Sequence, residues 1–105
     1  MDRIVLAVDV GGSHVKALTS KETDRRRFKS GDSLSAEQMV DGVLQAVAGW
    51  DWDVVSVGIP TPVRNGNVVA EPVNLGGGWV GFDYEQAFGK PTKILNDAAM
   101  QAVGS

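Results

Sequence analysis

The chain contains no cysteine and a single histidine, His14, among its 105 residues. Disulfide bonds, thiolate metal sites and cysteine nucleophiles are therefore excluded, and one histidine cannot form a histidine metal cluster by itself. A chain without cysteine also suits a reducing compartment, so we expect a cytoplasmic protein.

Long apolar runs are missing as well. Met1-Asp2-Arg3 leads directly into a strand-like segment of only about five apolar residues, far fewer than a bilayer span requires. We therefore expect neither a signal peptide nor a membrane partner.

Positive charge is scarce, because the formal net charge is −3 and the only cationic run is Arg25-Arg26-Arg27. Nucleic-acid binding requires clustered lysine and arginine, so no nucleic-acid partner is expected. Three arginines could meet a polyanion, but a solvated strand or hairpin face is the simpler interpretation.

The residues that are present suit one small α/β domain. The chain is 43% hydrophobic and 22% charged and has 13 glycines, which point to tight turns or close approach to a ligand. A chain of this length forms one core, so a two-lobed cleft would need a second lobe from elsewhere.

Periodicity and end signals predict an ordered series of strands and helices. The helix over 35–49 is the clearest, because Ser35 and Gln38 have capping-box spacing and apolar residues then recur on one face. A shorter helix has Asp83 as its N-cap and Gly89 as its C-cap. The full prediction comprises strands over 3–10, 14–19, 53–59 and 92–95, an edge strand over 24–30, a turn or hairpin within 60–72, irregular structure over 74–79, and helices over 35–49, 83–88 and from Asp97 onward.

The segment VDVGGSHVKAL places an acid, two glycines, a hydroxyl and a lysine around a predicted turn. Gly11 and Gly12 can adopt positive φ and expose consecutive N–H groups, which would form an anion-binding nest. Ser13 adds a hydroxyl and Lys16 a positive charge. Asp9 has no obvious cation partner in the sequence, and it would repel a phosphate unless a Mg²⁺ ion lay between them. A phosphate cradle with a metal and a simple Gly-Gly hairpin turn are both open on this evidence.

The segment ILND ends a predicted strand beside a predicted helix N-terminus, which is where ligands collect in open α/β sheets. Asp97 could accept the proton of a hydroxyl that attacks a phosphoryl group, and Asn96 could orient that hydroxyl. Asp97 could equally serve only as the N-cap of the last helix.

Two irregular loops, GIPTPV and EPVNLGGGW, are candidates for a sugar site with Arg64, Asn74 and Trp79. Sugars bind amides through their hydroxyls and pack against aromatic or apolar walls in rigid loops. The alternative is that Trp79 belongs to the core and Asn74 to a turn.

Taken in order, these pieces resemble the N-terminal lobe of the ROK family of repressors and sugar kinases, within the actin/hexokinase/heat-shock ATPase superfamily, and the polyphosphate glucokinases in particular. VDVGGSHVKAL is similar to the family's first phosphate motif, PVNLGGGW to its Asn-Leu…Trp sugar loop, and ILNDAAMQAVG to its Asn-Asp segment. The likeness covers nearly the whole chain. It implies an α/β fold of the ribonuclease-H-like type, a mixed sheet with three antiparallel first strands and helices on its faces.

The resemblance implies Mg²⁺-dependent phosphoryl transfer from ATP or polyphosphate to the 6-hydroxyl of a hexose, with glucose as the first candidate. On the acceptor side it makes Asp97 the catalytic base and Asn96 and Asn74 sugar contacts. Arg64 and Trp79 belong to the same predicted sugar-binding loops.

On the donor side the resemblance places Gly11, Gly12 and Ser13 around the phosphoryl donor and Asp9 beside the metal. Lys16 adds positive charge to this donor site. The donor-side and acceptor-side assignments follow from the matched motifs, residue by residue.

Two residues depart from the family pattern. Ser13 stands where threonine is more frequent, which keeps the hydroxyl, and Thr61 stands where a Pro-Gly-Pro loop would have glycine. The family's second phosphate loop, adenosine segment, Glu-x-Gly-His residues and Cys/His zinc motif are not found. Residues 1–105 are thus interpreted as the N-terminal lobe, with the C-terminal lobe as a missing partner and weak or no activity for the chain alone.

Two further interpretations remain open. The first is a sugar-sensing lobe of a regulator of the same family, which the retained Asp97 and the lack of a helix-turn-helix before Met1 disfavour. The second is an excised structural subdomain. For such a subdomain, an exposed face between lobes would favour self-association, so a homodimer is a further candidate partner.

Overall fold

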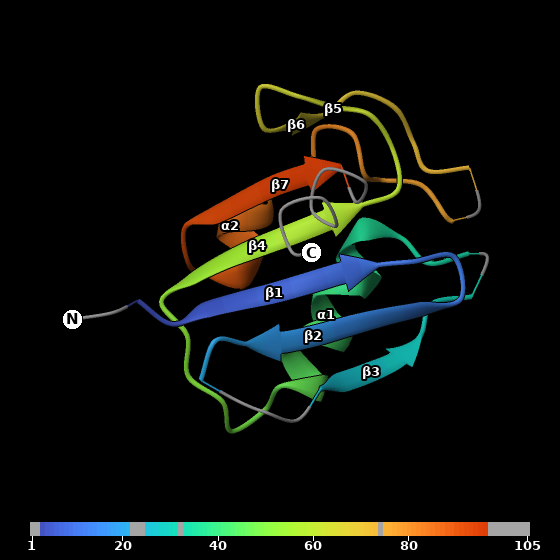
Figure 1. Cartoon of the computed structure of the whole chain (residues 1–105). Coiled ribbons are helices and arrows are strands. Elements are labelled where there is room, and N and C mark those ends of the chain that lie inside the picture. Colours follow the sequence, from blue (N-terminus) through green and yellow to red (C-terminus); the bar gives the residue numbers. More distant parts are fainter. Residues whose placement is uncertain (1–2, 22–24, 32, 74, 97–105) are drawn as a thin grey trace.

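The computed structural model describes residues 3–21, 25–31, 33–73 and 75–96 (Figure 1). Its strands are β1 (Val5–Val10), β2 (His14–Thr19), β3 (Arg26–Lys29), β4 (Val54–Ile59), β5 (Val63–Arg64), β6 (Asn67–Val68) and β7 (Thr92–Asn96), and its helices are α1 (Ala36–Ala46) and α2 (Tyr84–Phe88). The main sheet has the strand order β3-β2-β1-β4-β7, and β5 and β6 form a separate pair.

The sheet is mixed in the way the sequence predicted. β1, β2 and β3 pair antiparallel, whereas β4 runs parallel to β1 and β7 runs parallel to β4. The polar third strand lies at an edge of the sheet, where its exposed side chains remain in water. The predicted α/β fold of the ribonuclease-H-like type is confirmed.

Alternation along the strands sorts side chains onto two faces of the sheet. In β1, Leu6, Val8 and Val10 are fully buried, while the residues between them are half-buried. Both described helices cover the face that carries these buried residues, behind the sheet in Figure 1. In the described part of the chain, the predicted packing of helices on the sheet is thus found on this face.

Helix α1 begins as its capping box predicts. The Ser35 hydroxyl accepts a hydrogen bond from the Gln38 N–H at 3.1 Å, and the Ser35 N–H donates to the Gln38 side-chain oxygen at 3.0 Å. The helix ends at Ala46, before the predicted residue 49, because the chain leaves helical geometry at Val47.

The predicted Asn-Gly turn and the predicted caps of the second helix are also confirmed. Asn65 and Gly66 adopt positive φ, 52° and 78°, which closes the β5–β6 hairpin as an Asn-Gly turn. Asp83 caps α2 by accepting from the Gln86 N–H at 3.1 Å, and Gly89 ends it with φ 74°. The helix predicted from Asp97 lies outside the described residues. None of the helices in the described segments has the length and apolar character of a bilayer span.

Candidate functional site

The carboxyl ends of β1, β4 and β7 meet at one edge of the sheet, because these strands run parallel. The register places Asp9 of β1 beside Gly58 of β4, and Gly58 beside Leu95 of β7. Asn96 follows as the last residue of β7. The predicted donor-side acid and the predicted sugar-side amide thus belong to strands that only β4 separates, about 10 Å apart.

The β1–β2 turn is held by hydrogen bonds from within and from β3. The Gly11 N–H donates to the His14 carbonyl oxygen at 2.9 Å. Ser30 follows β3, and its N–H donates to the Ser13 carbonyl oxygen and its hydroxyl to the Gly11 carbonyl oxygen, both at 3.0 Å. Ser30 is buried and fixes the turn from the side of the edge strand.

The geometry of this turn corrects part of the predicted nest. Neither Gly11 nor Gly12 adopts a positive φ, and the Gly11 N–H is already bound to His14. Gly11 is instead required by close approach, since a Cβ there would lie 3.1 Å from the His14 carbonyl oxygen. Gly12 and Ser13 are exposed, and their N–H groups have no acceptor within the described segments. An anion at the turn would therefore meet these two N–H groups.

Asp9 has a cation facing it, contrary to the expectation from the sequence. Asp9 and Lys16 are directly opposite each other in the β1–β2 register, and both are half-buried on the face away from α1. Opposite charges at such a position attract across the strands. A metal is therefore not required to balance the charge of Asp9.

The described residues fit a magnesium ion only in combination with a phosphate ligand. Within the described ranges, no group of three or more His, Asp or Glu residues could hold a metal by itself. Mg²⁺ commonly takes one or two carboxylates and completes its shell with water and phosphate oxygens. Asp9 is the carboxylate that the β1 end offers for this purpose.

Asn96 connects the end of β7 to the loop after β4. Its side-chain Nδ2 donates to the Thr61 carbonyl oxygen at 2.8 Å. The Thr61 hydroxyl in turn donates to the Ala70 carbonyl oxygen at 2.7 Å, and Thr61 is buried. Thr61 stands where the resemblance leads one to expect glycine. It connects the two ends of the 60–72 loop to each other through Ala70, and it connects the loop to the Asn96 side chain.

The Trp79 side chain is buried in the hydrophobic core. It is 0% exposed and belongs to the hydrophobic cluster that includes Phe88 and Ile94. The alternative interpretation of Trp79 as a core residue thus describes its position in this structure.

The backbone around Trp79 is fixed by two side chains that the sequence reasoning missed. The Glu71 carboxylate accepts from the Trp79 N–H at 2.9 Å and from the Val80 N–H at 3.0 Å, and the Tyr84 hydroxyl donates to the Trp79 carbonyl oxygen at 2.8 Å. Burial, and then the charge of Glu71, raises the pKa of Tyr84 above its ordinary range. No sequence signal links Glu71 to a partner eight residues away in an irregular loop.

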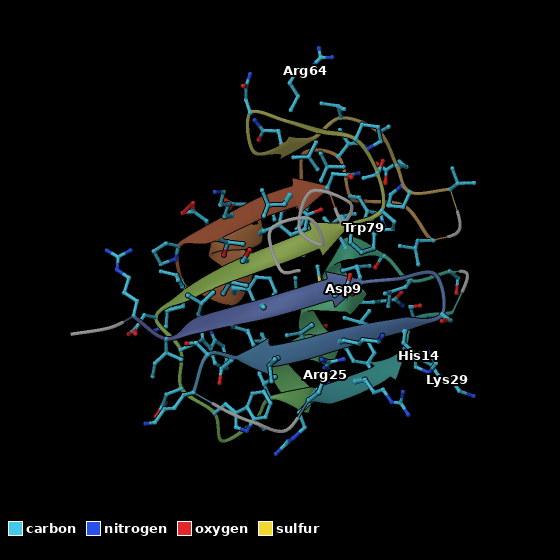
Figure 2. The ribbon with its side chains drawn as sticks, in the orientation of Figure 1. Asp9, His14, Arg25, Lys29, Arg64 and Trp79 are labelled. Carbon is cyan, nitrogen blue, oxygen red and sulfur yellow. The ribbon has the colours of Figure 1, made fainter. Side chains whose placement is uncertain are left out.

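Of the remaining predicted site residues, the structure describes only Arg64, which lies apart from Asp9. Arg64 is exposed on the β5–β6 hairpin, and Figure 2 shows it at the outer tip of the molecule, away from Asp9. Asn74 and Asp97 lie outside the described residues, so their roles as a sugar contact and as the catalytic base stay predictions.

No model of a protein family and no curated protein matches the sequence. Solved structures do match. A ROK family glucokinase from Streptomyces griseus, in complex with glucose and AMPPNP, aligns with a TM-score of 0.76 and 24% identity over 96% of this chain and 35% of that one. An inorganic polyphosphate/ATP-glucomannokinase from Arthrobacter sp. strain KM aligns with a TM-score of 0.76 and 20% identity, over 92% of this chain and 45% of that one.

A ROK hexokinase from Thermus thermophilus aligns with a TM-score of 0.66 and 22% identity over 90% of this chain. These likenesses establish that the chain shares the fold of part of the ROK sugar kinases, as its motifs suggested. The chain spans 35% of the length of the Streptomyces and Thermus proteins.

Proposed function

We propose that this chain is the N-terminal lobe of a sugar kinase, which transfers a phosphoryl group from ATP or polyphosphate to the 6-hydroxyl of a hexose. Glucose is the first candidate for that hexose. The observation that supports this most directly is that β1, β4 and β7 end at the same edge of the sheet, where Asp9, the Thr61 loop and Asn96 are found.

The β1–β2 turn is the donor side of the proposed site. The exposed N–H groups of Gly12 and Ser13 would bind phosphoryl oxygens, and Lys16 would add positive charge on the same side of the sheet as Asp9. Asp9 would hold a Mg²⁺ ion together with the donor's phosphate oxygens. When bound, that ion neutralises charge on the transferring group.

The end of β7 is the acceptor side. Asn96, whose amide is bound to the Thr61 carbonyl, fixes the loop that would line the sugar. In the proposed reaction the Asp97 carboxylate takes the proton of the 6-hydroxyl as its oxygen attacks phosphorus, and the bond from phosphorus to the donor oxygen breaks.

Trp79 acts indirectly in this proposal. Its buried ring and its backbone bonds to Glu71 and Tyr84 hold the 71–79 loop, so that Asn74 would be presented to the sugar from a rigid support. Trp79 is thus a positioning residue rather than a sugar contact.

Phosphoryl transfer depends on positioning donor, metal and acceptor in a cleft that excludes water. Since the chain spans 35% of the Streptomyces glucokinase, we expect hexose binding without substantial turnover from this chain alone. The C-terminal lobe is the partner that the proposal requires.

Saturation-transfer difference NMR with glucose and 6-deoxyglucose tests the proposal on the chain as it is. We expect transfer to glucose protons and weaker transfer to 6-deoxyglucose, because the proposed site binds the 6-hydroxyl. Asn96→Ala should reduce the glucose signal, and Asn67→Ala, at the exposed first residue of β6, serves as the control. Equal signals from the two sugars in the unmodified chain would contradict the proposal.

A further inference from the structure

The cationic edge strand β3 presents alternate residues to opposite faces of the sheet. The Arg26 guanidinium lies 4.7 Å from the centre of the Trp50 ring and donates to the Ala46 carbonyl oxygen at 2.8 Å, so it faces α1. The Phe28 ring lies against Gly42 of α1, where a Cβ would meet it at 2.5 Å. The residues between and beside these two therefore face the other way.

Arg27 and Lys29 thus lie on the face of the sheet away from α1, and both are exposed. The register continues this surface onto β2, since Lys16 is directly opposite Arg27 and His14 directly opposite Lys29. Arg25 precedes β3 and is exposed, and the alternation of side chains assigns it to the same face. We name Arg25, Arg27, Lys29 and Lys16 the basic stripe.

The basic stripe ends at the β1–β2 turn. Ser30, the residue after Lys29, bonds through its backbone to Ser13 and through its hydroxyl to Gly11. Figure 2 shows His14 and Lys29 near each other at this end of the sheet, with Arg25 at the opposite end of β3. The stripe therefore leads from the far end of the edge strand to the turn proposed to bind the phosphoryl donor.

The basic stripe is positively charged, whereas the formal net charge of the whole chain is −3. Neither β2 nor β3 contains an acid, and Asp9 is the only acid of β1. Attraction of an anion to the stripe would therefore come from local charge, since the net charge of the chain would repel it.

From this arrangement we infer that the basic stripe binds a linear polyanion, inorganic polyphosphate, and directs it to the turn at Gly12 and Ser13. Arg25, Arg27 and Lys29 extend over about 14 Å along the strand. A nucleotide carries its charge on one short triphosphate, whereas a polyphosphate chain repeats its charge along its whole length and can contact every cation of the stripe. The inference rests on the proposed kinase function and specifies its donor.

The test is isothermal titration calorimetry of the chain with short-chain polyphosphate and with ATP. The Arg27→Gln/Lys29→Gln double variant removes two stripe charges, and Lys90→Gln/Lys93→Gln removes the same charge from exposed positions at and before the opposite edge strand β7. We expect polyphosphate affinity to fall about tenfold in the first variant and to stay unchanged in the second. Affinity for polyphosphate should also weaken as salt is added.

Equal loss in both double variants, or no binding of polyphosphate to the unmodified chain, would overturn the inference. It would also be overturned if ATP lost as much affinity as polyphosphate in the stripe variant, or if a single-stranded oligonucleotide bound the stripe equally tightly. Glucose binding, measured on the same samples, separates the two proposals. If the chain binds glucose but not polyphosphate, the stripe is rejected and the proposed kinase function stands. If the chain binds polyphosphate but not glucose, the proposed kinase function is rejected.

Discussion

The two glycine-rich segments of the molecule use glycine for different reasons. In the β1–β2 turn, Gly11 has no positive φ, and its N–H donates to the His14 carbonyl oxygen. In the loop before Trp79, one glycine allows close packing and another adopts a left-handed backbone conformation. A Cβ on Gly76 would lie 2.4 Å from the Ser33 carbonyl oxygen, and Gly78 has φ 85°. The first segment thereby leaves N–H groups exposed at its tip, and the second is pressed against the body of the protein. Glycine richness alone would have assigned both segments to ligand binding.

The largest expected loss of stability follows from removing Trp79, whose buried ring holds the second segment against the core. Trp79→Ala should lower the free energy of unfolding by about 4 kcal/mol, because it empties a fully buried aromatic site. Chemical denaturation measures this change. A loss below about 1 kcal/mol would contradict the role of Trp79 in holding this loop, since the ring would then contribute little to the core.

Gly76→Ala comes next, with an expected loss of about 2–3 kcal/mol. The added methyl group meets the backbone carbonyls of Ser33 and Leu34, which cannot rotate away as a side chain could. Gly77→Ala is the matched control, because a Cβ there meets nothing within 4 Å and its φ is not positive. Similar unfolding midpoints for the two variants would contradict the close approach at residue 76.

In the first segment we expect a smaller effect. Ser30→Ala should lose about 1 kcal/mol, since one hydrogen bond to the Gly11 carbonyl disappears while the Ser30 backbone bond to Ser13 remains. Amide exchange at Gly11, whose N–H is bound to the His14 carbonyl oxygen, should become faster. Ser33→Ala, at an exposed serine, is the control, and unchanged exchange in Ser30→Ala would show that Ser30 does not hold the turn.

At neutral pH the smallest effect concerns Tyr84, the only tyrosine of the chain. Burial and the charge of Glu71 raise its pKa in the folded state above the ordinary tyrosine value of 10.0. The neutral phenol is favoured by folding, so its contribution to stability is fully present below pH 10 and is lost as the pH rises through the folded-state pKa. Absorbance titration of tyrosinate should show ionisation only above the ordinary range, and Glu71→Gln should lower that pKa. Ionisation near pH 10 in the folded chain would contradict the buried hydrogen bond to Trp79.

Features set by neighbouring residues could be predicted from the sequence. The capping box at Ser35, the caps of α2 at Asp83 and Gly89, and the Asn65-Gly66 hairpin all follow from interactions within four residues. The mixed sheet with three antiparallel first strands was implied by the motif resemblance, and the strand pairing and the likeness to ROK kinase structures confirm it at the level of the fold.

Features set by tertiary contacts could not be predicted in this way. The burial of Trp79 depends on Glu71 and Tyr84, which reach its backbone from separate positions in the loop. The role of Ser30 requires knowing that β3 ends beside the β1–β2 turn. The position of Lys16 opposite Asp9 depends on the register of a hairpin whose turn conformation differed from the expected one.

The central claim is that the edge formed by the ends of β1, β4 and β7 binds a hexose. A ¹H–¹⁵N NMR spectrum of the chain, recorded alone and with millimolar glucose, tests it most directly. We expect dispersed peaks and glucose-induced shifts confined to Thr61, Asn96 and their neighbours, with the basic stripe unaffected. A dispersed spectrum that does not respond to glucose, or one whose shifts lie away from this edge, would contradict the claim.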